Sequence, residues 1–373
     1  MTKLLFVIPE YSHGGTNKSL ENLLALIDKT KYKISIFCLY EDGGDYYKKL
    51  FAPYVLKKSR LYYWMHDNVL TRKVMGFYNK VTKRDNFGRL YRREVGHLQQ
   101  KYCFDTIVAY QEGTATKFVS FFTNGNKIAW IHCDYGTWTN GIRRKSDEIC
   151  YSNINNIVCV SESARKSFVA IFPEFQKRTC SIYNLLNTQV IKMFANFNDG
   201  LNDDVFTIVS VGRLSSVKQF ERIPGIVYEI KKNVERPFRW YILGSGASER
   251  KICEEISKYN LQEFVLLLGT KENPYPYMRN ADLVACTSSS ESFSYVIAEA
   301  KILHTPVVSN HFPVAYEVID EQTGWITNIK DMPQLLARII NDEDREYSRK
   351  KASIMSYEYS NEEILKKIET LFQ

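Results

Sequence analysis

The stretch FTIVSVGRLSSVK, residues 206–218, decides the fold of the half of the chain in which it lies. Its first part, FTIVSVG, is largely apolar and β-branched without alternation, which predicts a strand covered on both faces of a parallel sheet. The strand would end at Gly212, and Arg213 and Lys218 follow in a loop. Ligands bind at the carboxyl ends of such strands, and two cations there suit an anionic oxygen. The alternative is a surface loop with two solvated cations.

Short apolar runs of the same kind recur in two series. The first series is KLLFVIP (3–9), ISIFCLY (34–40), FDTIVAY (104–110), KIAWIH (127–132) and NIVCVS (156–161). The second series is FTIVSVG (206–212), RWYILGSG (239–246), FVLLLG (264–269), ADLVACTS (281–288) and PVVSN (306–310). Between strands, apolar residues recur at helical spacing, as in Leu20, Leu23, Leu24 and Ile27. The pattern predicts an α/β fold with two Rossmann-like domains whose parallel sheets face an interdomain cleft.

The domain boundaries are predicted from composition. We expect a first Rossmann-like domain at 1–185 and a second at 186–355, with the Asn-, Asp- and Gly-rich stretch 193–205 read as a linker. The C-terminal segment 356–373 is predicted to be a helix that packs back on the first domain. Ser360 and Glu363 are expected to form a capping box at its start.

Composition excludes several classes of protein. The 373 residues are 45% hydrophobic and 25% charged, which is typical of a globular chain and not of a disordered one. No apolar run approaches the ~18 residues of a membrane-spanning helix, and the apolar stretch before Pro9 is too short for a signal peptide. The eight cysteines form no CxxC pair, so we expect buried, reduced thiols in a cytosolic protein. No DxD or Asp/His cluster indicates a divalent metal.

The stretch ESFSYVIAEA, residues 291–300, places two carboxylates around an apolar run. Ser292 or Ser294 is a suitable N-cap, and the N-terminus of a helix favours phosphate. Glu291 would precede the helix and Glu299 would lie about two turns into it, where a carboxylate can accept from both hydroxyls of a ribose. Two exposed acids are the alternative, but the apolar run between them predicts burial.

Taken together, Arg213-x4-Lys218 and the later Glu291-x7-Glu299 resemble the motifs of the GT-B retaining glycosyltransferases of family 4, the group 1 glycosyltransferases. GGTNKSLENLLAL (14–26) is similar to that family's first glycine loop and helix. LGSGASERKICEEISKYNLQEFVLLLG (243–269) is similar to its later glycine, helix and strand stretch. The resemblance covers nearly the whole chain and implies the GT-B fold.

The resemblance also implies roles for individual residues. Arg213 and Lys218 would hold the donor diphosphate and stabilise the leaving group, so no metal or other cofactor would be needed. Glu291 would bind the reacting sugar, and His132 would lie beside the donor sugar and the acceptor. The implied donor-binding residues are Gly14, Gly15, Ser292, Phe293, Ser294, Glu299 and Gly244. One departure concerns the donor sugar: Ser-Phe-Ser at 292–294 replaces the family's usual Gly-Phe-Gly, which narrows the space beside that sugar.

Two acids on first-domain loops are candidates for the acceptor site. Glu112 in AYQEGT and Asp134 in HCDYGTW are expected to face the cleft. Either could orient an acceptor hydroxyl, and a loop acid in water is the alternative for both.

The segment from Lys57 to Lys101 is strongly basic. It holds twelve Lys or Arg against three acids, a net charge of +9 in a chain whose total is +8. The cations are interleaved with the aromatic residues Tyr62, Tyr63, Trp64, Phe77, Tyr78 and Tyr91. Such a pattern favours an anionic membrane surface over nucleic acid, with a merely solvated helical face or an acceptor-binding role as alternatives. We therefore expect a cytoplasmic protein bound peripherally to the inner face of the cell membrane.

The resemblance to the group 1 glycosyltransferases, taken with these features, implies a retaining, metal-independent hexosyltransferase. It would move a sugar from a nucleotide-diphosphate sugar, with UDP preferred, to a hydroxyl of a glycan acceptor, expected to be lipid-linked, in bacterial cell-envelope polysaccharide synthesis. A nucleotide-sugar epimerase of the same architecture and a non-catalytic partner subunit remain as alternatives. A dinucleotide-dependent dehydrogenase is disfavoured because no full GxGxxG follows the first strand.

Overall fold

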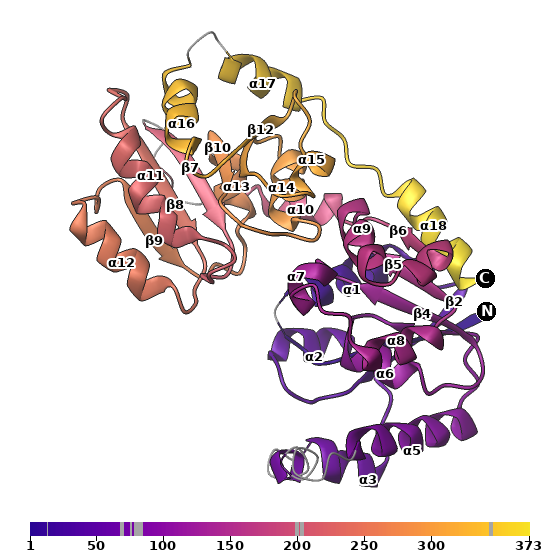
Figure 1. Ribbon diagram of the computed structural model, residues 1–373. Helices are drawn as coiled ribbons and strands as arrows, with labels where there is room; N and C mark the ends of the chain where they lie inside the picture. Colours follow the sequence, from indigo (N-terminus) through magenta and orange to yellow (C-terminus); the bar gives the residue numbers. More distant parts are fainter. Residues whose placement is uncertain are drawn as a thin grey trace. The chain divides into compact units, whose positions relative to one another are not determined.

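The computed structural model describes residues 1–12, 14–67, 71–74, 77, 85–197, 201, 205–342 and 346–373. These residues divide into two compact units (Figure 1). Unit 1 comprises Met1–Leu186 and Ser360–Gln373, and unit 2 comprises Asn187–Tyr359. Tyr78, Lys80, Lys83 and Arg84 of the basic segment lie outside the described residues.

The interpretation of 193–205 as an interdomain linker is wrong, because this stretch belongs to unit 2. Helix α10 (Thr188–Phe194) includes the first two residues of this stretch, and hydrogen bonds join the stretch to the segment around α13 (Tyr275–Asn280). The Asn273 side chain donates to the Phe194 carbonyl at 2.8 Å, and Arg279 donates to Asn196. Residues 198–200 and 202–204 of the stretch lie outside the described residues.

Unit 1 is built on a parallel sheet with strand order β2-β1-β3-β4-β5-β6 among its described residues. Its strands are β1 (Thr2–Ile8), β2 (Tyr32–Cys38), β3 (Thr106–Ala109), β4 (Asn126–Ile131), β5 (Asn156–Cys159) and β6 (Thr179–Ser181). Its helices are α1 (Gly15–Leu26), α2 (Asp45–Phe51), α3 (Arg60–Tyr62), α5 (Asn86–Lys101), α6 (Thr114–Val119), α7 (Tyr135–Thr139), α8 (Lys145–Ser152), α9 (Glu162–Ile171) and α18 (Glu362–Phe372). Shorter turns are η1 (Ala52–Tyr54), the π-helix η2 (Tyr63–Asp67) and η3 (Pro173–Arg178). The strand order reverses at β1 and β3, which is the switch point of a doubly wound sheet.

Unit 2 repeats the architecture with strand order β12-β11-β10-β7-β8-β9. Its strands are β7 (Phe206–Val211), β8 (Phe238–Leu243), β9 (Val265–Gly269), β10 (Leu283–Cys286), β11 (Val307–Asn310) and β12 (Gly324–Thr327). Besides α10 and α13, its helices are η4 (Phe220–Arg222), α11 (Ile223–Ile230), α12 (Glu249–Lys258), α14 (Tyr295–Ile302), α15 (Ala315–Val318), α16 (Met332–Asn341) and α17 (Glu346–Ile354). Here the order reverses at β7 and β10, so the switch point lies between these two strands.

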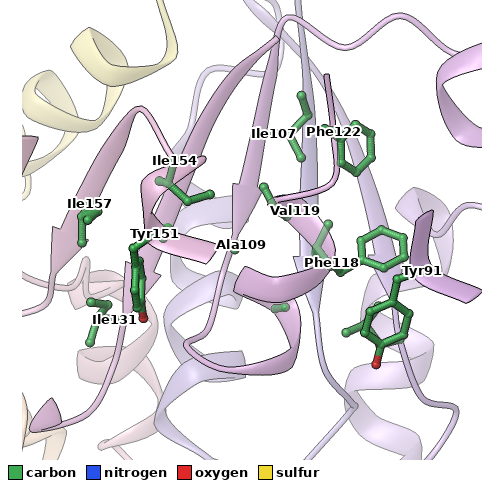
Figure 2. Packing of buried hydrophobic residues seen from close by; sticks show 14 of the residues in the cluster. Tyr91, Ile107, Ala109, Phe118, Val119, Phe122, Ile131, Tyr151, Ile154 and Ile157 are labelled. Carbon is green, nitrogen blue, oxygen red and sulfur yellow. The ribbon is translucent and has the colours of Figure 1, made fainter. Parts of the chain in front are cut away.

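Burial of the strands on both faces explains why their sequences are continuously apolar. Residues Leu4 to Ile8 of β1 have no exposed surface, and Ile208 and Val209 of β7 are equally buried. Figure 2 shows how helices complete the core of unit 1: Tyr91 of α5 lies beside Phe118 of α6, with ring centroids 5.4 Å apart. This contact fixes the long basic helix α5 to the body of unit 1.

The C-terminal helix α18 packs in unit 1 beside the N-terminal strand (Figure 1). The buried ring of Phe372 contacts the rings of Phe6 and Tyr32, each with centroids 5.9 Å apart. The predicted capping box of Ser360 and Glu363 is wrong, because Asn361 occupies the N-cap position without a side-chain cap. Its side chain instead exchanges two hydrogen bonds with the backbone of Leu186, at 3.1 and 2.8 Å, which replaces local capping with a tertiary contact.

The cysteines differ in how far they are buried. The prediction of buried cysteines holds for Cys38, Cys159 and Cys286 but is wrong for Cys103 and Cys253, which are exposed. Across the described residues, none of the helices combines the length and the apolar character needed to cross a membrane.

Candidate functional site

The carboxyl ends of β7 and β10 in unit 2 carry the predicted anion site. Gly212 ends the strand run with φ 155, and the loop that follows holds Arg213 and Lys218. Gly244, at the end of β8, has φ 147, and a Cβ there would lie 1.8 Å from the carbonyl oxygen of Gly212. Glycine at 244 therefore lets the two strand ends approach each other closely.

The loops after β7 and β10 are bonded to each other. The Ser289 N–H donates to the Val217 carbonyl at 2.8 Å, and the Thr287 hydroxyl donates to the Lys218 carbonyl at 2.7 Å. These bonds bring together side chains that are 73 positions apart in the sequence. Lys218 Nζ donates to Glu291 Oε1 at 2.5 Å, so the sequence motifs meet in one ion pair.

Ser288, which sequence reasoning missed, supports this ion pair. Its hydroxyl donates to the same Glu291 oxygen at 2.7 Å, and its carbonyl accepts from the Asn310 side chain at 2.9 Å. Ser288 is 1% exposed. Burial alone would lower the pKa of Lys218, but the Glu291 carboxylate outweighs this effect and raises the pKa overall. Lys218 is therefore a fixed cation at neutral pH, whereas Arg213 in the same loop is exposed.

Helix α14 begins at Tyr295, and the residues before it form a tight turn. Ser294 is the N-cap residue, without a side-chain cap hydrogen bond, and its φ of 63 lies in the left-handed region that favours glycine. A serine here carries conformational strain that a glycine would avoid. Ser292 is not the cap, and Phe293 is buried just ahead of the helix. The turn thus joins Glu291 directly to the N-terminus of α14.

Glu299 lies in the interior of unit 2. Because α14 starts at Tyr295, Glu299 lies just over one turn into the helix. The predicted position, about two turns into the helix, is wrong. Glu299 is 3% exposed and accepts a hydrogen bond from the Tyr275 hydroxyl at 3.3 Å. The prediction that it would be buried is correct.

A pocket of about 520 Å³ lies at the switch point of unit 1. It is formed by the segments that follow β1, β2 and β3, together with α6, α7 and α8. Its lining residues are Pro9, Glu10, Tyr40, Gln111, Glu112, Gly113, Thr114, Thr116, Lys117, Trp138, Arg144, Ser146, Asp147, Cys150 and Tyr151. Hydroxyl, amide and carboxylate groups beside aromatic rings suit a polar ligand with apolar faces.

Glu112 and His132 lie together at this edge of the sheet. The His132 backbone N–H donates to Glu112 Oε2 at 2.9 Å. Burial raises the pKa of the Glu112 carboxyl despite this hydrogen bond, and burial lowers the pKa of His132 to about 3. Because burial lowers this pKa, the imidazole is neutral at physiological pH, and it packs against the ring of Tyr110 with centroids 5.0 Å apart.

The other predicted residues of unit 1 have different surroundings. Asp134 caps α7 by accepting from the Thr137 N–H at 3.0 Å, and it also accepts from the Ser167 hydroxyl at 2.6 Å. It does not line the pocket, whereas Asp147, which no sequence motif indicated, does. Gly14 and Gly15 are exposed at the start of α1, and a Cβ on Gly14 would meet nothing within 4 Å.

The chain is similar to known proteins over its second half and in its fold. Residues 193–358 match the family model described as glycosyl transferases group 1, and this region contains Arg213, Lys218, Glu291 and Glu299. Over 183 residues the chain is 28% identical to the N-acetylgalactosamine-N,N'-diacetylbacillosaminyl-diphospho-undecaprenol 4-alpha-N-acetylgalactosaminyltransferase of Campylobacter jejuni, covering 48% of each chain. The chain thus spans about half the length of the curated relatives it matches.

Solved structures match the whole chain. HepE of Anabaena in complex with UDP has a TM-score of 0.75 at 16% identity, covering 100% of this chain and 99% of that one. A variant of S. aureus TarM, in complex with fondaparinux, alpha-GlcNAc-glycerol and UDP, has a TM-score of 0.70 at 14% identity, covering 100% of both. The chain therefore has the GT-B fold, and its residues 193–358 are similar to the group 1 glycosyl transferases.

Proposed function

We propose that this protein is a retaining glycosyltransferase that moves a sugar from a nucleotide-diphosphate sugar to a hydroxyl of a glycan acceptor. The observation that carries the proposal is the convergence of Lys218, Glu291 and the turn before α14 at the switch point of unit 2. An open α/β sheet binds its ligand at that point. The match of 193–358 to the group 1 glycosyl transferases supports the same assignment.

The donor would bind unit 2. Lys218 and Arg213 would neutralise the diphosphate, with backbone groups of 292–294 adding donors next to the N-terminus of α14. Glu299 would accept from the ribose hydroxyls, and Glu291 would bind the sugar. UDP is the nucleotide we favour, since HepE and TarM were solved with UDP.

The acceptor would bind the pocket of unit 1. Glu112 lines this pocket and can orient a hydroxyl group, and the exposed face of Trp138 and the ring of Tyr40 can pack on a sugar ring. Asp147 offers a second carboxylate there. The Campylobacter relative is named for a sugar carried on diphospho-undecaprenol, which supports a lipid-linked glycan acceptor in bacterial envelope synthesis.

The reaction we favour is front-face transfer without a metal or other cofactor. The acceptor oxygen forms its bond to the anomeric carbon on the face from which the diphosphate leaves, and the leaving phosphate oxygen takes the acceptor proton. Positive charge from Lys218 and Arg213 would stabilise the departing diphosphate. A glycosyl-enzyme trapped in a Glu291→Gln variant would contradict this mechanism.

The basic segment 57–101 supports the proposal that the protein binds peripherally to the inner face of the cell membrane. Tyr63, Trp64 and Phe77 are each at least 60% exposed, and Arg89, Arg92 and Arg93 form part of the exposed face of α5. Some cations serve the fold instead: Lys58 pairs with Glu41 at 3.0 Å, and Arg72 pairs with Asp42 at 2.7 Å. The exposed remainder suits anionic lipid headgroups.

A two-part assay tests the function. The protein is incubated with UDP-, GDP- and ADP-hexoses, first alone and then with polyprenyl-diphosphate glycans, with and without EDTA. Acceptor-dependent transfer that keeps the anomeric configuration and persists in EDTA is the expected result. Interconversion of the donor without acceptor would favour the epimerase, and inertness toward every donor would favour a non-catalytic subunit.

A further inference from the structure

In the proposed diphosphate site, the Glu291 carboxylate already pairs with Lys218, the cation that would bind the diphosphate. The two side chains are 24% and 14% exposed, so water screens their 2.5 Å contact only in part. A diphosphate that binds Lys218 must compete with the Glu291 carboxylate for the same cation. The pair therefore sets how strongly different nucleotides bind.

Glu291 is not free to swing away from an incoming phosphate. The Ser288 hydroxyl donates to Oε1, the oxygen that Lys218 also contacts, and Asn310 anchors the Ser288 carbonyl. Both bonds to the carboxylate end on Oε1. The carboxylate is thus fixed beside Lys218, and its other oxygen, Oε2, is the one we assign to a ligand.

A donor and a spent nucleotide differ at this position. The β-phosphate of a nucleotide sugar is esterified, whereas that of a nucleoside diphosphate is terminal and ionises a second time near pH 6. The donor also offers sugar hydroxyls to the carboxylate. The spent nucleotide offers none and brings one more negative charge toward it.

We propose that Glu291, held by Ser288, discriminates against the nucleoside diphosphate product and so promotes its release. The carboxylate repels the terminal phosphate and competes with it for Lys218, while it accepts a hydrogen bond from a sugar hydroxyl of the intact donor. This inference rests on the proposed function, because it assigns the diphosphate of the donor to Lys218.

Calorimetric titration of the full chain with UDP and with UDP-glucose tests the inference. Glu291→Gln keeps the shape of the side chain and removes its charge, so UDP should bind about tenfold more tightly while UDP-glucose gains little or loses affinity. The matched control is Glu254→Gln on α12, where an exposed carboxylate pairs with Arg250 at 2.8 Å. This control should leave both affinities unchanged.

Two further variants make the result specific. Ser288→Ala should change the ratio of the affinity for UDP to the affinity for UDP-glucose in the same direction as Glu291→Gln, but by a smaller factor. The reason is that the carboxylate loses its hydrogen bond from Ser288 but keeps its charge. In a Lys218→Met background, Glu291→Gln should increase the affinity for UDP by less than half of the increase that it causes in the wild type. The reason is that no lysine remains for which the carboxylate and the phosphate could compete. Thermal melting of each variant confirms that it is folded.

The outcomes separate the two proposals. If the wild type binds UDP but Glu291→Gln binds it no more tightly, the discrimination is refuted and the donor assignment stands. If the wild type binds none of UDP, GDP, ADP or their hexose conjugates, the proposed function is refuted and this inference with it.

Discussion

Glu299 is a buried carboxylate that accepts a hydrogen bond from the Tyr275 hydroxyl at 3.3 Å. We predict that Glu299→Gln raises the KM for the donor by about tenfold or more, with a smaller change in kcat. The reason is that a ribose contact stabilises the bound donor and the transition state alike. Steady-state kinetics with varied donor measures this. Tyr275→Phe keeps the carboxylate and should have the smaller effect, and an unchanged KM in Glu299→Gln would remove the ribose role.

His132 provides a pH prediction. Burial lowers its pKa from 6.5 to about 3, so between these values the unfolded chain binds more protons than the folded one. The contribution of His132 to the free energy of unfolding is therefore complete above pH 6.5. It falls as the pH drops toward 3, by up to about 1.4 kcal/mol per pH unit.

Chemical denaturation of the wild type and of His132→Gln at pH 7 and pH 5 measures this term. The variant should lose less stability on acidification. Burial raises the pKa of Glu112, which gives the opposite slope in both proteins and cancels in the comparison. His97→Gln, on the exposed face of α5, is the control and should follow the wild type. Equal slopes for His132→Gln and the wild type would contradict the prediction.

At the residue scale, the sequence predicted that Lys218 and Glu291 lie near each other but not that they pair directly. The spacing of strands placed Lys218 and Glu291 at neighbouring strand ends because parallel strands share a carboxyl edge. Their direct pairing depends on side-chain directions set by the loop bonds of Thr287 and Ser289, which no periodicity encodes. Asp147 was missed because α8 reaches the pocket through tertiary packing alone.

At the element scale, all ten apolar runs read as strands form strands. The two strands that were missed, β6 and β12, are sheet edges of three and four residues. Runs as short as TCS and GWIT hold too few apolar residues to be distinguished from loop sequence. The predicted C-terminal capping box is wrong for another reason: the Asn361 side chain makes hydrogen bonds to the backbone of Leu186 and not to its own helix.

Helix α5 shows how one element combines packing with a surface role. Leu90, Tyr91, Val95 and Leu98 are buried against unit 1, while Arg89 and Arg93 are exposed on the opposite side. We predict that Arg89→Glu with Arg93→Glu lowers recovery on phosphatidylglycerol vesicles in a flotation assay. Each basic residue near an anionic membrane contributes about 1 kcal/mol, and a reversed charge is repelled.

The control for this prediction has the same change of charge in unit 2. Arg250→Glu with Lys251→Glu alters two exposed cations on α12 and should leave flotation unchanged. Added salt should weaken binding of the wild type, because exposed charges are screened. Recovery that is equal on neutral and anionic vesicles would show that α5 does not bind the membrane through its charge.

At the scale of the whole molecule, each unit carries a reversal of strand order, and each reversal carries a different kind of site. The edge of unit 2 has a fixed cation, a carboxylate and a helix N-terminus, which suit a diphosphate. The edge of unit 1 has a pocket lined by acids, amides and aromatic rings, which suits a glycan. Two sheets of one design would thus divide the two substrates between them.

This division predicts where a nucleotide slows amide hydrogen exchange. With UDP, the strongest protection should fall on peptides covering 212–218 and 287–302 of unit 2, because the ligand holds both loops in place and lowers their rate of opening. Peptides covering the unit 1 pocket at 144–151 should change less, and those covering α18 should not change. Mass spectrometry at several exchange times measures this pattern. Protection concentrated at 144–151 would assign the nucleotide to unit 1 and reverse the roles of the two sites, since a ligand protects most strongly the loops that it contacts.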